Sequence, residues 1–151
     1  MLATEILTQD HRDALALIDQ LNGARNDDPG NRKIFDRLAN ALELHMQAEE
    51  EIYYPAVAEH EEFEDLIEEN VPEHEMVREN LTQMSELAVS SDVFQTVLEE
   101  LRAAILAHAT HEEEDIFPES IEVLGRDRIS ALGNRIDQLK GEAGMSRSAR
   151  M

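Results

Sequence analysis

The sequence has no cysteine. This absence excludes disulfide bonds, thiolate zinc sites, cysteine-held iron–sulfur clusters and a cysteine nucleophile. Any metal ion must therefore bind to histidine, aspartate, glutamate or tyrosine. Glycine is also scarce, at 6 of 151 residues, and the chain has no phosphate-binding glycine loop, no Gly-x-Ser-x-Gly and no His-Glu-x-x-His. These absences argue against the common classes of hydrolase.

Positive charge is scarce as well. The chain has 13 Lys and Arg residues against 34 Asp and Glu residues, and its formal net charge is -21 at pH 7. A surface with this charge repels phosphate backbones and anionic lipids, so we expect neither a nucleic-acid partner nor a membrane partner. The chain also lacks the run of ~18 apolar residues that a membrane span needs, and it lacks a secretory signal. We therefore expect a cytoplasmic protein.

Tryptophan is absent and aromatic residues make up only 4% of the chain, while Leu, Ile, Val and Ala recur at spacings of three and four. This pattern is typical of an all-α protein with one domain. The predicted domain spans residues 1–140, and a disordered tail is expected over 141–151. The predicted helices cover residues 3–21, 32–60, a third segment that follows acidic residues 59–69 and ends near 88, 93–117, and a shorter fifth helix over 127–140 that is interrupted near Gly133.

An internal repeat organises the four long helices. The segment HMQAEEEIYYP, which begins at His45, matches HATHEEEDIFP, which begins at His108, 63 residues later. His11 and His74, in the first and third helices, have the same separation. The first two helices are therefore predicted to form one helical hairpin and the next two its copy. Because the shared positions are His and Glu, the repeat indicates a shared site.

Helix geometry places these residues in the core. Each residue advances ~100° around an α-helix, so the members of each His-x-x-x-Glu pair lie on the same face. An ionised carboxylate in an apolar interior costs several kcal/mol unless it is paired, and the same stripes carry no Lys or Arg. A bound cation removes this cost. The candidate metal ligands are His11, His45, Glu49, His74, His108 and Glu112.

The ligand types narrow the choice of metal. Imidazole and carboxylate without thiolate suit iron, manganese, zinc or copper, and two carboxylates among four imidazoles suit a bridged pair of ions. We place iron first, with manganese and zinc behind it. The remaining histidines are predicted to lie outside the site: His60 lies about 22 Å along its helix from His45, at ~1.5 Å per residue, and His111 is expected to be solvated. Glu113 is the nearest substitute for Glu112 as a ligand.

Two tyrosines follow Glu49. Tyr53 lies one turn later and is expected to pack in the core rather than to approach the metal. Tyr54 lies on the opposite side of a regular helix, unless Pro55 distorts that geometry.

At these residues the sequence resembles the hemerythrin-like family, in particular bacterial HHE cation-binding domains. The resemblance covers about residues 4–118 and includes DHRDALALIDQL, HMQAEEEIYYP, PEHEMVRENL and HATHEEEDIFP. It implies an up-down-up-down four-helix bundle with two non-haem iron ions joined by an oxo or hydroxo bridge. It also implies that the four histidines are terminal ligands, that the two glutamates are bridges, and that the small-molecule ligand is O2, peroxide or nitric oxide.

One position departs from the oxygen-carrying members of the family. Those proteins have a second histidine in the third helix, one turn from the first, whereas the positions one turn from His74 are Asn70 and Arg78. The resemblance then implies that one iron lacks a nitrogen ligand, and that a water, a tyrosine or an open position completes its shell. Simple reversible oxygen carriage is the function that this departure argues against.

Several functions stay open at this point. The leading hypothesis is a di-iron protein that binds, senses or stores O2 or a related small molecule. The alternatives at the same centre are decomposition of hydrogen peroxide, as an enzyme, and a response to nitric oxide or iron. A ferritin-like oxidase or iron store ranks low because no histidine has a glutamate three positions before it. The remaining hypothesis is a metal-free helical interaction protein. The sequence does not indicate whether the protein is a monomer or a homo-oligomer, and it does not identify a redox partner.

Overall fold

The computed structural model describes residues 1–149, with side chains as far as residue 144. Every regular element in this part of the chain is helical. The α-helices are α1 (Ala3–Leu21), α2 (Pro29–Ala48), α3 (Tyr54–Val57), α4 (Glu64–Ser85), α5 (Asp92–His111), α6 (Phe117–Leu124) and α7 (Arg126–Ala149). Two π-helical segments, Glu49–Tyr53 and Glu112–Ile116, join α2 to α3 and α5 to α6, and a 3-10 turn, Glu61–Phe63, precedes α4.

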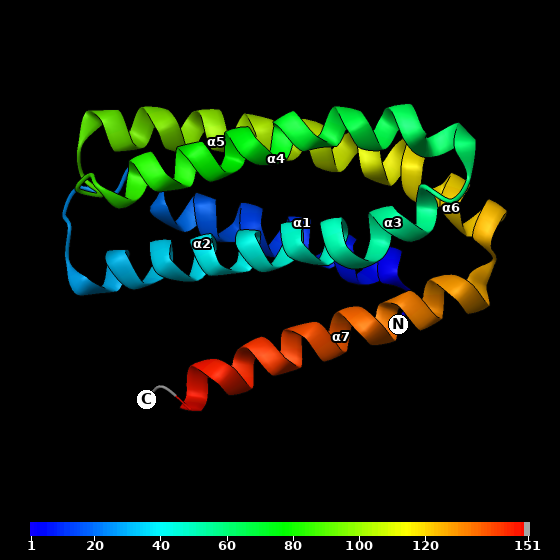
Figure 1. Cartoon of the computed structure of the whole chain (residues 1–151). Helices are drawn as coiled ribbons and strands as arrows, with labels where there is room; N and C mark the ends of the chain where they lie inside the picture. The colour runs from blue at the N-terminus through cyan, green and yellow to red at the C-terminus, as the bar shows by residue number, and fades with distance from the viewer. Residues whose placement is uncertain (150–151) are drawn as a thin grey trace.

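The long helices form an up-down-up-down bundle. The α2–α3 and α5–α6 segments each act as one rod, and short connections make successive rods antiparallel. In Figure 1, α1 and α2 form one layer and α4 and α5 the other, while α7 lies outside the first layer. Helix α7 packs against α1 and α2. The predicted all-α fold, a four-helix bundle with an extra C-terminal helix, is confirmed.

The two π-helical segments occur at the same place in both repeats, and proline explains them. Pro55 and Pro118 have no N–H, so neither can donate to the carbonyl four residues earlier as a regular helix requires. In the π-helical turns the bonds run to the fifth preceding residue instead, from Tyr54 to Glu49 and from Phe117 to Glu112. The wider turn changes which side chains beyond it face the bundle interior. The second predicted helix, 32–60, is therefore not regular along its length.

Helix starts follow ordinary capping chemistry. The Asp28 carboxylate accepts a hydrogen bond from the Asn31 amide, and Pro29 occupies the first turn of α2. The Ser91 hydroxyl accepts from the Phe94 amide at the start of α5. Each such cap contributes about 1 kcal/mol.

Helix α7 is longer than the predicted fifth helix. It continues past Lys140 to Ala149, through most of the segment that was expected to be disordered. Alanine, glutamate, methionine and arginine in this segment favour a helix and offset the two glycines, 141 and 144. The expected tail is thus helical over residues 141–149, and residues 150–151 lie outside the described part of the chain. Gly133 does not interrupt the helix.

Apolar side chains form two clusters, one on each side of the candidate ligands. One fills the half of the bundle near the α1–α2 and α4–α5 turns, and the other fills the half that α6 and α7 cover. On the interior faces of the helices, the buried apolar residues include Leu7, Ile18, Leu38, Ile52, Ala56, Val77, Leu81, Leu101 and Ile105. Ala41, four residues before His45, is exposed and lies on the side of α2 against which α7 packs.

Gly133 gives a test of how α7 is held. A Cβ at this position would overlap the backbone carbonyl of Met1 and would lie 2.9 Å from the amide nitrogen of Ala3. We expect Gly133→Ala to lower the free energy of unfolding by about 1–3 kcal/mol, as overpacking does elsewhere. The matched control is Gly141→Ala in the same helix, which meets nothing within 4 Å and is expected to gain up to about 1 kcal/mol. Chemical denaturation of both variants measures the difference, and equal stability would contradict the close packing of α7.

Candidate metal centre

The structure brings all six predicted residues together between the two apolar clusters. His11, His45, His74 and His108 come from α1, α2, α4 and α5, and the two glutamates come from the π-helical segments. One ligand atom from each of His11, His45, Glu49, His108 and Glu112 lies within 4.8 Å of the others. His74 joins this group because its Nε2 lies 3.2 Å from Glu49 Oε1. All are buried except His108, whose side chain is 11% exposed.

The two glutamates lie at the middle of the cluster. Glu49 Oε1 is 3.1 Å from His45 Nε2 and 3.2 Å from His74 Nε2. Glu112 Oε1 is 3.1 Å from His11 Nε2 and 3.0 Å from His108 Nε2. Each carboxylate therefore contacts histidines from both helical hairpins. Such a position suits a group that is shared between two cations.

The imidazoles are grouped by hairpin. The ring centroids of His11 and His45 are 4.9 Å apart, and those of His74 and His108 are 5.3 Å apart. The distance between His11 and His108, across the hairpins, is 6.0 Å. The repeat seen in the sequence thus becomes two similar histidine pairs that face one another.

A carboxylate outside the cluster holds the Nδ1 atom of each of the four clustered histidines. In each case Nδ1–H donates to the carboxylate, which leaves Nε2 free to bind a cation. These four partners obey the same 63-residue repeat, since Asp10 corresponds to Glu73 and Glu50 to Glu113. The pairs are His11–Glu113 at 3.0 Å, His45–Asp10 at 2.9 Å, His74–Glu50 at 2.7 Å and His108–Glu73 at 2.7 Å.

Sequence analysis missed these partners. Glu113 was considered only as a substitute ligand, whereas it holds His11, and Glu50 was not singled out. Asp10 and Glu73 were not considered at all. The signal that would have found them was present, because each lies next to a predicted ligand and each recurs 63 residues away.

Several buried polar atoms without hydrogen-bond partners fit a cation site. Among the described residues, Nε2 of His11, His45 and His108, Oε2 of Glu49 and Oε1 of Glu112 are buried and have no hydrogen-bond partner. Unpaired buried polar atoms are costly, and here they converge on one place. Nitrogen and oxygen donors of these types suit a first-row transition metal. The residues present therefore fit a metal centre.

Electrostatics in the metal-free chain lead to the same conclusion. Burial by itself lowers the pKa of His45, but the Glu49 charge and the hydrogen bond to Asp10 outweigh it and raise the pKa to about 10. His108 is also raised well above its ordinary value, against burial, mainly by Glu112. Burial raises the pKa of Glu49, but the charge of His45 and the neighbouring hydrogen bonds bring it well below its ordinary value. Without a metal, protons on His45 and His108 supply positive charge beside the carboxylates.

Tyr54 reaches the site, contrary to the expectation for a regular helix. Its hydroxyl donates to Glu112 Oε2 at 3.0 Å, and its ring lies 5.7 Å from that of His74 at an interplanar angle of 23°. The π-helical turn before it is the reason. Its repeat counterpart Phe117 stacks on His11 in the same way but carries no hydroxyl. Tyr53 packs in the core, and its hydroxyl hydrogen-bonds to Ser120. Burial raises the pKa of Tyr54 well above 10.0, so its phenol stays protonated.

The other residues in question lie outside the cluster. Asn70, at a position where oxygen carriers have histidine, is 2% exposed, and its side-chain nitrogen has no partner among the described residues. Arg78 turns away to form ion pairs with Glu43 and Glu50 at 3.1 and 2.9 Å. His60 and His111 are half-buried and are not among the clustered residues.

Comparison with known proteins identifies the family. A model of the hemerythrin HHE cation binding domain matches residues 2–120. The chain belongs to this family. A crystal structure of a hemerythrin HHE cation binding domain-containing protein from Mycobacterium kansasii has the same fold, with a TM-score of 0.76 and 24% identity over 95% of this chain and 90% of that chain. A search of curated proteins found no match.

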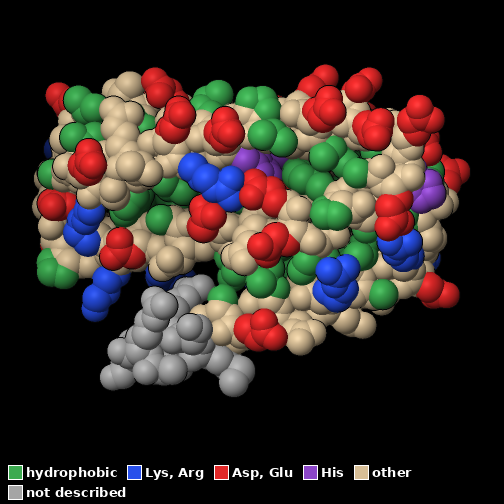
Figure 2. Space-filling view, in the orientation of Figure 1, with side chains coloured by type: hydrophobic (Ala, Val, Ile, Leu, Met, Phe, Trp, Pro, Cys, Tyr) green, Lys and Arg blue, Asp and Glu red, His purple; other side chains and the backbone are tan. Residues whose placement is uncertain are grey.

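Membership in the HHE family implies a cation-binding protein, and the cluster of buried His and Glu residues is where the HHE domain would hold a metal. On the face shown in Figure 2, acidic side chains spread over most of the surface, and histidine is visible in a recess between the upper and lower layers. None of the helices in the described residues combines the length and the apolar character needed to cross a membrane.

The raised histidine pKa predicts how pH affects the metal-free HHE domain. A group whose folded-state pKa is raised contributes stability fully below its unfolded value, and this contribution disappears as the pH rises through the folded value. For His45 the window runs from 6.5 to about 10. We expect the melting temperature to fall across this range, as measured by circular dichroism after chelation. His45→Gln should flatten the dependence, and a melting temperature that rises with pH would contradict this account.

Proposed function

We propose that this HHE domain binds two iron ions and that the reduced pair combines with O2 or a related small neutral molecule. The observation that carries the proposal is the convergence of buried, unpartnered imidazole nitrogens and carboxylate oxygens. The same atoms in a metal-free interaction protein would leave two carboxylates in the core with protons alone to neutralise them. Burying two carboxylates in this way lowers the stability of the fold, and a metal-free interaction protein has no use for them that would offset the loss.

The pairing of the rings supports an assignment of ligands. His11 and His45 would bind one ion, and His74 and His108 the other. Glu49 and Glu112 would join the two ions, because each contacts histidines from both hairpins. With two nitrogen donors to each ion, positions remain for water, for the small molecule or for the Tyr54 phenol. Asn70 does not supply the additional imidazole of the oxygen carriers.

Iron in such ligands would supply reversible electron transfer to a small oxygen- or nitrogen-containing molecule. The protein would contribute orientation and charge. The outer carboxylates fix each imidazole with Nε2 toward the centre, and the buried setting excludes bulk water. Tyr54 holds one proton at its hydroxyl, in contact with Glu112.

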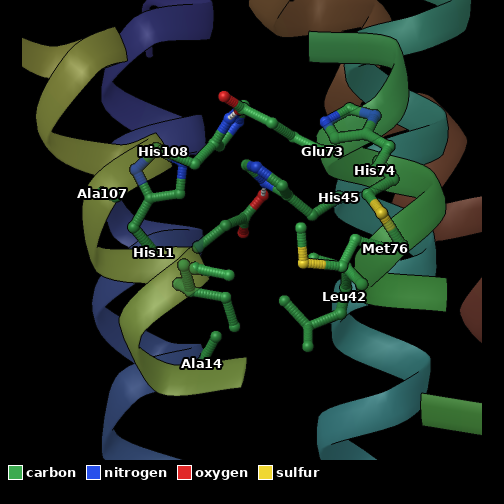
Figure 3. A pocket seen from close by; sticks show the side chains of 14 residues that line it. His11, Ala14, Leu42, His45, Glu73, His74, Met76, Ala107 and His108 are labelled. Atoms are coloured by element: carbon green, nitrogen blue, oxygen red, sulfur yellow. Dashed lines mark hydrogen bonds and ion pairs between the residues drawn. The ribbon is translucent and has the colours of Figure 1, made fainter. Parts of the chain in front are cut away.

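A cavity next to the histidines supports a small neutral ligand. It has a volume of about 230 Å³, and residues from α1, α2, α4 and α5 line it. Figure 3 shows His11, His45, His74 and His108 at one end and apolar side chains such as Leu42 and Ala14 at the other. A diatomic molecule or hydrogen peroxide fits this space.

Metal analysis is the direct test. Protein expressed with iron should contain two irons per chain and should show near-ultraviolet charge-transfer absorption. His45→Ala and His108→Ala should each lose most of the iron, because each variant removes a nitrogen atom that binds the metal directly. Loss of a residue that only supports a ligand would lower the affinity by about 10–100-fold. His60→Ala is the matched control, since His60 lies outside the cluster. No transition metal in the iron-loaded wild type would rule out the proposal.

Tyr54 favours hydrogen peroxide decomposition as a second candidate. Cleavage of the peroxide O–O bond places negative charge on oxygen, which a hydrogen-bond donor stabilises, and the buried Tyr54 hydroxyl in contact with Glu112 is such a donor. Only one half of the repeat has this hydroxyl, because Phe117 occupies the corresponding position. The enzyme function therefore depends on a feature that simple ligand binding does not need.

Added peroxide separates the two candidates. For the enzyme, we expect sustained oxygen evolution with the iron absorption intact, and a decrease of at least about ten-fold in Tyr54→Phe at unchanged iron content. The control is Tyr53→Phe, which loses a hydroxyl that bonds to Ser120 away from the ligands. Bleaching without turnover would exclude the enzyme and leave the binding protein.

A further inference from the structure

The repeat creates two equivalent grooves that lead from the surface toward the histidines, one between α1 and α2 and the other between α4 and α5. Residues 63 positions apart occupy the same places in the two grooves. Their linings correspond as Asp10 to Glu73, Asp13 to Met76, Ala41 to Ala104 and Leu44 to Ala107. Any difference in access between the two grooves must come from these substitutions or from α7.

Helix α7 closes the α1–α2 groove. The Lys140 ammonium forms an ion pair with Asp10 Oδ1 at 2.5 Å, while Asp10 Oδ2 accepts from His45. As a result the Asp10 side chain is 17% exposed, whereas its counterpart Glu73 is 48% exposed. The hollow that remains beside α7 is a separate, charged space, and Asp10 belongs to the linings of both this hollow and the cavity at the histidines. Asp10, which contacts both His45 and Lys140, therefore separates the charged hollow from the cavity at the histidines.

The side chains of the two grooves reinforce this difference. Leu44 is half-buried in the α1–α2 groove, where the α4–α5 groove has only the methyl group of Ala107. Met76 and Ala107 line the cavity and are exposed, with Met76 at 50%. Figure 3 shows Ala107 and Met76 on opposite sides of the cavity. His108, beside this groove, is 11% exposed, against 6% for its counterpart His45.

We propose that the α4–α5 groove is the passage by which a small neutral molecule reaches the metal centre, and that α7 with Lys140 closes the equivalent passage between α1 and α2. The inference rests on the proposed function, and it adds the path by which the ligand enters and the kind of ligand that the path admits. Met76, Ala104 and Ala107 admit a molecule of diatomic size. The Glu73 carboxylate at the mouth, on a protein of net charge -21, disfavours anions.

The repeat supplies a matched pair of variants. Ala104→Phe places a ring in the proposed passage, and Ala41→Phe places the same ring at the equivalent position of the closed groove. The experiment measures the rate at which nitric oxide combines with the reduced, iron-loaded full chain in a stopped-flow instrument. We expect Ala104→Phe to slow combination at least about ten-fold at unchanged iron content, because the ligand must wait for side-chain motion. Ala41→Phe should leave the rate within about two-fold.

A second measurement does not depend on iron. Xenon enters apolar cavities of this kind, so 129Xe NMR of the metal-free full chain reports directly on the passage. Xenon exchange should be slowed by Ala104→Phe and unaffected by Ala41→Phe. If Ala104→Phe does not fold, Met76→Trp blocks the same mouth from α4. This measurement stands even if the wild type binds no iron, which would defeat the proposed function alone.

Two results would contradict the proposed passage. If neither blocking variant slows nitric oxide or xenon, or if Ala41→Phe slows them as much as Ala104→Phe does, the α4–α5 passage is wrong. If Lys140→Met speeds nitric oxide combination in the Ala104→Phe background and Lys140→Arg does not, the closure by α7 is supported. If Lys140→Met has no effect in that background, Lys140 does not close the second groove.

Discussion

Two carboxylates buried in a helical core are the constraint on which the rest of this structure depends. Glu49 and Glu112 are fully buried, and no Lys or Arg forms an ion pair with either of them among the described residues. Burial of an ionised carboxylate costs several kcal/mol unless a positive charge answers it. The raised pKa values of His45 and His108 show that these imidazoles hold protons beside the carboxylates in the metal-free chain, and the chain belongs to a family of cation-binding domains. The surrounding apolar clusters then keep water away from the arrangement.

Much of this could be predicted from the sequence, because the repeat places a His or a His-x-x-x-Glu pair on each long helix and helix geometry puts all six residues on core faces. The outer carboxylates could not be identified from helical periodicity, since Glu50 and Glu73 lie on largely exposed faces and resemble ordinary solvated glutamates, and only the 63-residue repeat marks them. Tyr54 was misplaced because the expectation assumed a regular helix, and the missing N–H of Pro55 favours a π turn instead. The length of α7 was underestimated because its polar composition resembles that of a disordered tail.

The duplication in the sequence is nearly symmetric at the histidines and asymmetric around them. Tyr54 corresponds to Phe117 and Leu44 to Ala107, and Lys140 forms an ion pair with Asp10 while the corresponding Glu73 is exposed. These residues distinguish the two hairpins from one another. In the proposed function they would make the two ions, and the two approaches to them, unequal.

The outer carboxylates also have a mechanical consequence. Glu73 on α4 holds the histidine of α5, Glu113 after α5 holds that of α1, Asp10 on α1 holds that of α2, and Glu50 after α2 holds that of α4. The four hydrogen bonds form a closed ring around the bundle. The carboxylate of each helical segment bonds to the histidine of one neighbour, and the histidine of that segment bonds to a carboxylate of the other neighbour. A helix that rotates or slides by one residue therefore displaces two histidines, so the ring couples the register of all four helices to the position of the imidazoles.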